Sequence, residues 1–504
     1  MYTRQNIDLT DMLDENKTDN LENIQNLIRD VFDQKWNEDF IYDAINQKTV
    51  KYSEFFSEIV AYQKKLKNKN INSGDTLCIL LNNSIEFVKM YFVGLISNFT
   101  IVPIDPEKGR SEIKEIINDV KPKLVIYDDL DYKFLGEKIQ INEINQQVLQ
   151  ESKDNLSLIN NLDIEQDFLI TFTSGSTGKP KGVVHSLKNL ILSALSFNEK
   201  FNFNSKNIFL HNLPMSYMAG ILNLIFLPFI SESKIVIDHR FSLKSAMDFW
   251  KIPEEFSVNT FWFTPTIIGL LLKFDRSNKG VEFTQNKSII GCVGTSALNP
   301  TIKDEFENKY KIKLYESYGL SETLFVTTNS PNLNNHGVGE LLKNTKINFI
   351  EKEIIIKVPW MFKRYHGLYK NENLTDDFFI SGDLGEISKE NILMISGRKK
   401  DLIIKGGINI SPKKLEDFII DKKIFQECVV LGFPDKVLGE KTVCFILSIE
   451  NNDNVKKKLN KKIIDELGKD YHIDEFMELV EIPKTVNGKI NKPQIRELYH
   501  KRDK

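Results

Sequence analysis

The sequence predicts an α/β protein with a large N-terminal domain of mostly parallel βα-layered sheets, a small antiparallel or barrel-like subdomain, and a small α+β domain at the C-terminus. Three observations support this prediction. Short apolar strands alternate with helical segments through most of the chain. From Lys343 to Ile395 the pattern changes to short strands and glycine turns. From Asp401 onward, helices and strands alternate within about a hundred residues, which is enough for a separate small domain.

The individual elements follow a polar leader, residues 1–37. Helical periodicity is strongest where apolar side chains recur every three or four positions, and strands are short apolar runs between turn residues. The helices expected in this part of the chain are 53–66, 85–93, 113–120 and 187–197. The strands expected are 76–81, 101–104, 124–127, 168–173, 208–213, 234–237, 260–263 and 289–293. Strands alternating with helices of this length indicate a mostly parallel sheet.

Length and charge limit the possible partners. A chain of 504 residues has room for about three units of roughly 150 residues each. Its 67 basic and 70 acidic residues give a formal charge of -3, so no broad electrostatic attraction to nucleic acid or an anionic membrane is expected. The longest apolar run, Ala219 to Ile230, is interrupted by Asn223 and Pro228. It is shorter than the about 20 residues that a bilayer requires, so we expect buried core and no membrane span.

Cysteine usage and the N-terminal composition indicate a reduced compartment. Each cysteine lies in an apolar, strand-like run and none forms a CxxC pair: Cys78, Cys292, Cys428 and Cys444. They are expected to be small buried hydrophobes. The first thirty residues contain no apolar segment typical of a secretion signal, and their acidic residues argue against an organelle transit peptide. The expected location is cytoplasmic.

The segment Thr171–Val183, TFTSGSTGKPKGV, has the composition of a phosphate-binding loop. It does not match the GxxxxGK[ST] pattern that opens a helix in P-loop proteins. Gly175 and Gly178 are too closely spaced, and Lys179 is followed by Pro180, which discourages an immediate helix. The expected structure is therefore a loop between two strands.

Within this loop, glycines permit close backbone approach to a polyphosphate. Ser174, Ser176 and Thr177 offer hydroxyl donors, and Lys179 and Lys181 offer countercharge. The alternative interpretation is a solvated hairpin tip rich in Ser, Gly and Lys. The density of these residues favours phosphate binding.

A second group of functional side chains lies in YESYGLSET, Tyr315–Thr323. It contains aromatic rings, an expected backbone turn at Gly319, the Ser321 hydroxyl and the Glu322 carboxylate. An adenine-stacking ring beside a Mg²⁺ ligand has this composition, because Mg²⁺ prefers oxygen donors and usually takes one or two carboxylates plus phosphate oxygens. Taken alone, the same residues would fit an ordinary turn after a strand.

Two further turns carry charged groups. SGDLGEI is expected to place Asp383 in a glycine turn, and GRKKD places Arg398 on a neighbouring turn. A carboxylate and a guanidinium so placed can share a vicinal diol such as ribose, although a surface ion pair is the commoner explanation. PKTVNGKINK is expected to be a turn that presents Lys489. By itself it is an ordinary exposed loop.

Taken in order, these segments resemble the adenylate-forming superfamily, which includes acyl-CoA synthetases, adenylation domains of nonribosomal peptide synthetases and beetle luciferases. The resemblance runs from about residue 40 to about residue 495 and is closest in character to the acyl-CoA synthetases. Five motifs fall in the family's order and approximate spacing: TSGSTGKPKG, YGLSE, SGD, GRKKDLIIKGGINISPKKLE and the terminal NGK.

The resemblance implies a two-step reaction that uses ATP, Mg²⁺ and CoA. A carboxylate attacks the α-phosphate of ATP to give an acyl-adenylate and pyrophosphate, and a thiol then displaces AMP. Catalysis would depend chiefly on charge neutralisation and positioning. Lys489 would bridge the carboxylate and the phosphate, Glu322 would hold Mg²⁺, and Thr177 would contact the pyrophosphate or the metal. Asp383 with Arg398 would take the ribose hydroxyls.

The same resemblance assigns further residues. Tyr318 would stack on adenine against the turn Gly294, Thr295 and Ser296. The implied ATP-binding set is Thr173, Ser174, Gly175, Ser176, Thr177, Gly178, Lys179, Gly294, Thr295, Ser296, Ser317, Tyr318, Gly319, Ser321, Asp383 and Arg398. The implied acyl and thiol pocket is Tyr217, Met218, Gly220, Gly319, Gly406 and Gly407.

The resemblance also implies a mobile C-terminal domain. Residues 38–397 would form the large AMP-binding domain, 398–400 a hinge with its pivot at Lys400, and 401–504 the small domain. After adenylation the small domain would rotate, withdraw the lysine and bring Gly406 and Gly407 to the path of the thiol. Many family members have Asp where this chain has Lys400. The resemblance therefore implies the position of the hinge in this chain but not the energetics of its rotation.

The segment LPMSYMAG departs from the family's patterns. Ser216 and Tyr217 stand where many acyl-CoA synthetases have a phenylalanine–histidine pair and amino-acid-activating domains have an aspartate. There is no carboxylate from Phe209 to Ser231, so a buried substrate ammonium would be unpaired. This favours a non-amino carboxylic acid. Tyr217 is either a core residue or a gate between acyl and thiol sites. Ser321 and Ser381 replace commoner threonines and keep the hydroxyl.

Alternatives remain open at this point. The favoured function is an acid–thiol ligase that makes an acyl-CoA. A second is a ligase that loads the acyl group onto the phosphopantetheine of a carrier protein, a thiol of the same chemistry. A third is a non-catalytic nucleotide-binding protein, which predicts loss of Lys489 or Glu322, and both are present. A kinase is disfavoured because the P-loop pattern is missing.

Overall fold

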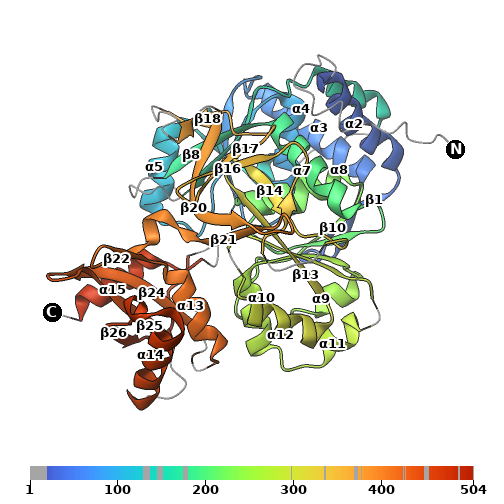
Figure 1. Ribbon diagram of the computed structural model, residues 1–504. Helices are drawn as coiled ribbons and strands as arrows, with labels where there is room; N and C mark the ends of the chain where they lie inside the picture. The colour runs from blue at the N-terminus through green and yellow to red at the C-terminus, as the bar shows by residue number, and fades with distance from the viewer. Residues whose placement is uncertain are drawn as a thin grey trace.

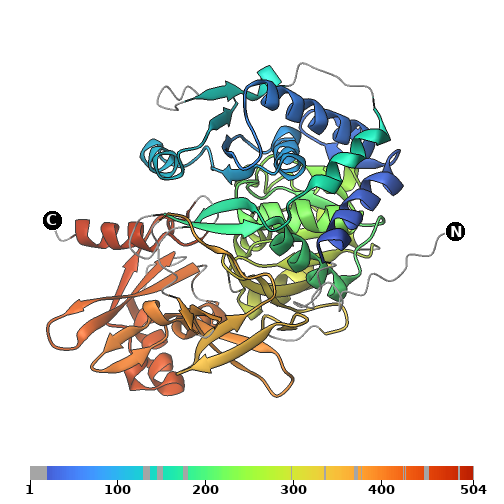
Figure 2. The same ribbon diagram turned by 90° about the horizontal axis from the view of Figure 1, so that it is seen from above.

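The computed structural model describes residues 20–128, 137–144, 151–173, 180–285, 287–296, 298–333, 337–367, 373–375, 377–423, 425, 427–447, 453–485 and 489–502. The chain forms a large body of layered sheets and helices, and a smaller C-terminal part that lies beside it (Figure 1). Two sheets of the large body are mostly parallel, as predicted, with helices packed against them (Figure 2).

The first sheet holds the elements that lead to the functional segments. Its strands, in spatial order, are β15 (Glu340–Leu341), β14 (Leu324–Thr328), β13 (Lys313–Leu320), β12 (Ile290–Val293), β11 (Thr260–Phe263), β9 (Ile208–His211), β10 (Lys234–Ile237), β1 (Asp39–Asp43) and β2 (Lys48–Lys51). From β13 across to β1 the pairing is parallel. The flanking strands β14 and β2 run antiparallel.

The second sheet carries the strand that leads into the phosphate-loop motif. Its order is β18 (Arg364–Tyr365), β8 (Lys181–Ser186), β7 (Asp167–Thr173), β4 (Thr100–Pro103), β3 (Thr76–Leu80), β5 (Leu124–Tyr127) and β6 (Lys138–Gln140). Strands β4, β3, β5 and β6 pair in parallel, and β8 pairs antiparallel with β7 and β18.

The change of pattern after Lys343 marks an antiparallel sheet, as predicted. Its order is β16 (Lys346–Ile350), β17 (Glu353–Lys357), β20 (Phe378–Ile387) and β19 (Leu374–Thr375), and β21 (Leu393–Arg398) also pairs with β20. The C-terminal sheet has the order β23 (Ile408–Ile410), β22 (Ile403–Lys405), β25 (Gly439–Leu447) and β24 (Glu427–Asp435), with β26 (Glu475–Glu478) parallel to β25.

Helices connect and cover these sheets. In the large body they are α2 (Asn20–Lys35), α3 (Tyr52–Asn68), α4 (Ile85–Ser97), α5 (Arg110–Val120), α6 (Ile141–Ile144), η1 (Lys153–Asn161), α7 (Leu187–Phe201), η2 (Ala219–Phe226), α8 (Leu227–Ile230), α9 (Lys251–Glu255), α10 (Pro265–Phe274), α11 (Lys279–Thr284) and α12 (Pro300–Tyr310). Further along lie η3 (Lys399–Asp401), α13 (Pro412–Asp421), α14 (Asp453–Leu467), η4 (Lys469–Tyr471) and α15 (Lys492–Lys501).

Helix α2 corrects the interpretation of residues 1–37 as a polar leader. Residues 20–35 form an amphipathic helix in which Ile24, Ile28 and Phe32 are fully buried. Their spacing of four residues places them on one helical face. The Phe32 ring packs on Phe56 of α3 at 4.7 Å. The surrounding charged residues lower the mean hydropathy of the segment and hide this face in a composition-based analysis. The earlier residues lie outside the described ones.

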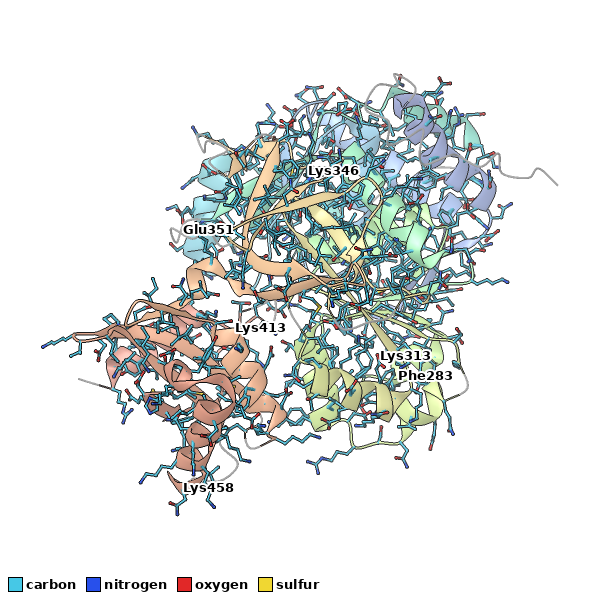
Figure 3. The ribbon with its side chains drawn as sticks, viewed as in Figure 1. Phe283, Lys313, Lys346, Glu351, Lys413 and Lys458 are labelled. Carbon is cyan, nitrogen blue, oxygen red and sulfur yellow. The ribbon has the colours of Figure 1, made fainter. Side chains whose placement is uncertain are left out.

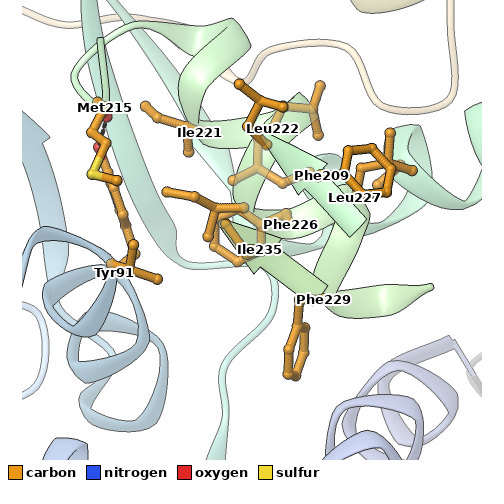
Figure 4. Packing of buried hydrophobic residues seen from close by; sticks show 14 of the residues in the cluster. Tyr91, Phe209, Met215, Ile221, Leu222, Phe226, Leu227, Phe229 and Ile235 are labelled. Carbon is orange, nitrogen blue, oxygen red and sulfur yellow. Dashed lines mark hydrogen bonds between the residues drawn. The ribbon is translucent and has the colours of Figure 1, made fainter. Parts of the chain in front are cut away.

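The apolar run Ala219–Ile230 is buried core, as predicted. It begins as the π-helical turn η2 and continues as α8, with Pro228 in the first turn of α8. The side chains interlock with α4 and the strands β9 and β10 (Figure 4). At one edge of this cluster the Tyr91 hydroxyl donates to the Met215 carbonyl at 2.7 Å. This hydrogen bond ties Met215, which lies shortly before the run, to α4.

The cysteines are free and buried, as predicted. Burial raises the pKa of the Cys78 and Cys292 thiols well above the ordinary value, so neither is a reactive thiolate at neutral pH. In the part of the chain that the structure describes, every helix is too short or too polar to cross a bilayer.

Candidate active site

Several predicted residues gather where the strands of the first sheet end. In parallel strands the carboxyl ends meet at one edge, which is where ligands of α/β proteins commonly bind. Strand β12 ends at Val293, and Gly294–Ser296 form the bend that follows. Thr295 adopts a positive φ of 76°. The Ser317 hydroxyl of β13 donates to the Val293 carbonyl at 3.0 Å and ties this bend to the YGLSE segment.

Tyr318, Asp383 and Arg398 form one connected group. The Tyr318 hydroxyl donates to Asp383 Oδ2 at 2.8 Å, and Arg398 Nε lies 2.9 Å from Asp383 Oδ1. Asp383 is only 3 % exposed, whereas the Arg398 side chain is 48 % exposed. A buried carboxylate between a phenol and an accessible guanidinium is a suitable place for a polar ligand with hydroxyl groups.

The local structure around Asp383 differs from the prediction. Asp383 and Arg398 do not lie on neighbouring turns but face each other on the paired antiparallel strands β20 and β21. Gly382 has a φ of 73°, yet it lies inside the continuous strand β20 and does not form a turn. The Ser381 hydroxyl accepts from the Asp383 N–H at 3.0 Å and keeps the strand in register. Strand pairing fixes the distance between the two charges more tightly than two loops would.

Gly319 is also not in a turn. Strand β13 runs through it to Leu320, with a register shift between Tyr318 and Gly319 where β14 pairs. A Cβ atom on Gly319 would lie 1.9 Å from the Leu324 carbonyl oxygen. Glycine is required here because two backbones approach closely at a β-bulge. The turn lies at residues 321–323 and presents Glu322.

Glu322 is held by a residue that the sequence analysis missed. The Tyr365 hydroxyl of β18 donates to Glu322 Oε1 at 2.9 Å. Burial raises the pKa of Glu322, while the Tyr365 hydrogen bond, Arg398 and Lys181 oppose this shift. Lys181 Nζ lies 5.4 Å from the centre of the Tyr365 ring. One carboxylate oxygen is thus oriented by protein, and the other can serve a cation.

His185 is a second residue without a motif signal. Its Nε2 lies 2.6 Å from the Ser321 carbonyl, and Asn189 Nδ2 lies 3.4 Å from its Nδ1. The ring is fully buried, and burial lowers its pKa to about 4. A neutral imidazole therefore donates to Ser321 and fixes the backbone next to Glu322. His185 ends the apolar run GVVH, and no motif there predicts this role.

The phosphate-loop motif lies partly outside the described residues. Positions 174–179, which include Ser174, Gly175, Ser176, Thr177, Gly178 and Lys179, are among those not described. The flanking strands β7 and β8 form an antiparallel pair with Thr173 opposite Lys181. This agrees with the expectation of a strand after the loop, where a P-loop would have a helix.

Lys489 of the C-terminal part reaches the segment 213–220 of the large body, which contains Tyr217. Its Nζ lies 5.8 Å from the centre of the Tyr217 ring, within the range of a cation–π contact. The Thr485 N–H donates to the Lys489 carbonyl at 2.6 Å. Tyr217 is half-buried and packs against the main core. Residues 272 positions apart in sequence are therefore neighbours.

The segment expected to be the hinge is anchored on both sides. The ammonium of Lys399 contacts Glu353 of β17 at 2.7 Å, and Lys492 of α15 contacts Asp401 at 2.6 Å. Lys400 lies between these pairs in η3. Gly406 and Gly407 form the turn between β22 and β23, and a Cβ on either would meet nothing within 4 Å. The Gly406 N–H donates to Leu438 within the C-terminal part.

This geometry places the ammonium of a C-terminal lysine, Lys489, beside Tyr217 of the large body. The family model described as "AMP-binding enzyme" matches residues 32–366, and that described as "AMP-binding enzyme C-terminal domain" matches residues 414–489. The chain therefore belongs to the AMP-binding enzyme family, the adenylate-forming superfamily. Its character is that of an acyl-CoA synthetase, an AMP-forming acid–thiol ligase.

Two curated relatives show the extent of the similarity. A malonate–CoA ligase of Arabidopsis thaliana is 28% identical over 371 residues, which cover 66% of this chain and 61% of the relative. The chain thus spans somewhat less than two thirds of that relative. A 2-succinylbenzoate–CoA ligase of Listeria monocytogenes is 26% identical over 461 residues, which cover 89% of this chain and 95% of the relative.

Solved structures share the fold over nearly the whole chain. An O-succinylbenzoate coenzyme A synthetase from Bacillus subtilis, solved with ATP and magnesium, has a TM-score of 0.81 at 21% identity and covers 94% of this chain and 99% of that chain. An anthranilate CoA ligase bound to anthranoyl-AMP has a TM-score of 0.83 at 16% identity and covers 94% and 96%. The predicted α/β fold with a small C-terminal unit is confirmed.

Proposed function

We propose that this protein activates a non-amino carboxylic acid with ATP and transfers the acyl group to the thiol of CoA. The observation that carries the proposal is the position of Lys489, whose ammonium lies over the Tyr217 ring. This ammonium comes from the C-terminal part and reaches Tyr217 of the large body, just before the buried apolar run Ala219–Ile230. A mobile cation delivered to an acyl site is what the first half-reaction needs, because carboxylate and triphosphate repel one another.

In the first step a carboxylate oxygen of the acid attacks the α-phosphorus of ATP, and the bond to pyrophosphate breaks. Lys489 neutralises the two approaching anions. Tyr318 stacks on adenine beside the Gly294–Ser296 bend, and Asp383 with Arg398 takes the ribose hydroxyls. The buried carboxylate between Tyr318 and Arg398 supports this assignment.

Glu322 suits a magnesium ion. It presents a half-buried carboxylate with one oxygen oriented by Tyr365, and oxygen donors are what Mg²⁺ prefers. Among the described residues no cluster of three or more His, Cys, Asp or Glu side chains could form a complete cage, so substrate phosphate oxygens would supply the other ligands. The bound ion would neutralise charge on the phosphates.

In the second step a thiolate attacks the acyl carbon and AMP leaves with the electron pair of the broken bond. Gly406 and Gly407 have open space where a side chain would be, which supports a role as a path for a slender thiol arm after rotation about Lys400. CoA is favoured over a carrier protein because the relatives include several CoA ligases. The lack of a carboxylate from Phe209 to Ser231 favours an acid without an ammonium group.

The proposal is tested by replacing Lys489 with alanine and measuring acid-dependent pyrophosphate release with a panel of carboxylic acids. Loss of one preorganised charge contact is expected to cost about 10²- to 10³-fold. Lys484→Ala is the matched control, because Lys484 lies just before the same turn and pairs with Glu427 at 2.9 Å. Full pyrophosphate release by the Lys489 variant would contradict the proposal. Parallel reactions with CoA and with a holo carrier protein identify the thiol.

A further inference from the structure

Two polar side chains, Trp262 and His211, lie side by side beneath the segment that carries Tyr217. Strands β9 and β11 are neighbours and parallel, with Thr260 opposite Phe209. Two residues further along each strand, Trp262 and His211 occupy equivalent positions. Because side chains alternate between faces with a period of two, both point to the same face as Thr260 and Phe209.

That face is the one covered by α7 and η2. The Trp262 ring lies 5.4 Å from Phe197 of α7 and 5.5 Å from Phe325 of β14. His211 Nε2 lies 3.0 Å from the Gly220 carbonyl in η2. The adjacent residue Phe263 points the other way, onto Phe306 of α12.

Both side chains are buried, and each has a polar atom without a partner. Trp262 is 2% exposed and His211 is 0% exposed. In the part of the chain that the structure describes, neither Trp262 Nε1 nor His211 Nδ1 makes a hydrogen bond. Buried polar atoms are nearly always paired, and an unpaired one is costly. Other buried indoles in this protein follow the rule: Trp250 donates to Asp275 at 2.9 Å and Trp360 to Phe325 at 3.0 Å.

The unpaired donor of Trp262 lies at the functional edge of the sheet. A Cβ atom built on Gly294 would stand 3.2 Å from Trp262 Nε1 and 3.3 Å from Ser317 Oγ. Gly294 begins the bend that follows β12, and Ser317 precedes Tyr318. The Gly220 carbonyl bound by His211 belongs to the segment that carries Tyr217. Trp262 Nε1 therefore lies beside the proposed nucleotide bend, and the His211 ring lies against the segment that carries Tyr217.

The pair offers no charge. Burial lowers the pKa of His211 to about 4, so the ring is neutral at pH 7, donates from Nε2–H to Gly220 and leaves Nδ1 as an acceptor. The indole is a donor only. An ionised second carboxylate or an ammonium placed here would be buried without a counterion from either residue, which is unfavourable. A hydroxyl group matches both the available donor and the available acceptor, and a carbonyl oxygen matches the donor.

We propose that the acid carries a neutral oxygen function, a hydroxyl or a carbonyl, on its acyl chain, and that Trp262 Nε1–H is the specificity-determining donor for it. His211 Nδ1 accepts a hydrogen bond from the substrate when the oxygen function is a hydroxyl. This inference rests on the function proposed above and narrows its substrate class. It separates this protein from enzymes for plain hydrocarbon acids, because the orphan donor would stay unpaired with such a substrate and the site would discriminate against it.

The test uses acids matched in size. Levulinate is compared with valerate, and para-hydroxybenzoate with benzoate, by acid-dependent pyrophosphate release. We expect the oxygenated member of at least one pair to have the higher kcat/KM by about 10- to 100-fold. Trp262→Phe keeps the aromatic packing and removes only the donor. We expect this variant to reduce the preference to within about threefold, since the hydrogen bond is its source.

Stability gives an independent readout. The Trp262 N–H has no protein partner, so its removal is expected to leave the melting temperature of the free enzyme unchanged or raise it. Trp250→Phe is the matched control on the opposite face of the sheet. It strips a partner from Asp275 and is expected to lower the melting temperature while leaving the acid preference intact.

The outcomes separate the two proposals. Equal use of both members of each pair by the unaltered enzyme overturns this inference and leaves the ligase function standing. The inference is also overturned if the preference for the oxygenated acid persists in Trp262→Phe. It is overturned as well if this variant lowers the melting temperature as much as Trp250→Phe does, because Trp262 Nε1–H would then bind a structural water. No pyrophosphate release with any acid overturns both proposals.

Discussion

The hydroxyl of Thr301 donates to the carboxylate of Asp421 at 2.7 Å and joins the large body to the C-terminal part. Thr301 lies in the first turn of α12, and Asp421 is the last residue of α13. A carboxylate at a helix N-terminus is favoured by the helix dipole. Asn299 Nδ2 adds longer contacts to Asp417 and Asp421 at 3.5 Å. In Figure 3, Lys413 of α13 marks the side of the C-terminal part that faces the large body.

This contact predicts a selective effect on one half-reaction. It belongs to the arrangement in which Lys489 meets Tyr217, and rotation of the C-terminal part would break it. Thr301→Val should therefore slow adenylation about two- to fivefold and leave thioester formation unchanged. The factor corresponds to the small free energy that an exposed charged hydrogen bond contributes. ATP–pyrophosphate exchange measures the first step, and release of AMP from preformed acyl-adenylate measures the second. Thr301→Ser is the control, and an equal loss in both steps would contradict the prediction.

Tyr365 is predicted to set the magnesium requirement. Its hydroxyl orients Glu322 and opposes the burial that raises the pKa of this carboxyl. Tyr365→Phe should raise the pKa further, so protons compete better with the metal and the Mg²⁺ concentration for half-maximal activity rises about 10-fold. The defect should grow as the pH falls. A magnesium titration at two pH values tests this, with Tyr471→Phe in the C-terminal part as control. An unchanged requirement would rule out the orienting role.

The contrast between Asp383 and Tyr365 shows how much of the site the sequence can predict. The partnership of Asp383 with Arg398 was predictable, because each lies in a motif with glycine and charge. Its geometry was not, since pairing of β20 with β21 is a nonlocal property and a glycine at positive φ can continue a strand as well as end it. Tyr365 lies in a two-residue strand without periodicity, so only the tertiary fold brings it to Glu322.

A similar limit applies to α2 and to the polar pair Trp262 and His211. The helix was hidden because charged residues surround a narrow apolar face. In the pair, each residue sits in an apolar strand, where a buried aromatic or histidine is ordinarily core. Their unpaired atoms are visible only when the neighbours on adjacent strands are known. Parallel sheets as such were predictable, because alternating strands and helices have few other packings.

His185 predicts a pH dependence of stability. Its pKa is lowered from 6.5 to about 4 in the folded protein, so the unfolded chain binds a proton that the native state does not. Between these values the free energy of unfolding must fall as the pH falls, by up to about 1.4 kcal/mol per pH unit. His185→Gln should remove the share of this dependence that His185 supplies, while His211, whose pKa is also lowered to about 4, keeps its own share.

Urea denaturation at pH 7 and pH 4.5 measures the free energy of unfolding of the variant and of the unaltered protein. The difference between the two proteins is compared, because buried carboxyls with a raised pKa change stability in the opposite direction and contribute equally to both. The unaltered protein should lose more stability on acidification than the variant. Parallel losses would show that His185 is already protonated in the native state.

The bulge at Gly319 predicts the largest effect of a single methyl group. A Cβ there would lie 1.9 Å from the Leu324 carbonyl, and backbone cannot yield as a flexible side chain can. Gly319→Ala should force β13 and β14 apart, displace Tyr318 and Glu322 from Asp383 and Tyr365, and destabilise the protein by about 3 kcal/mol or more.

Gly269→Ala is the matched control. Gly269 lies within α10 with nothing within 4 Å of its virtual Cβ, so alanine should stabilise that helix by up to about 1 kcal/mol. Thermal unfolding of both variants decides the matter, because an unperturbed Gly319→Ala protein would mean that the two strands are not held at this separation.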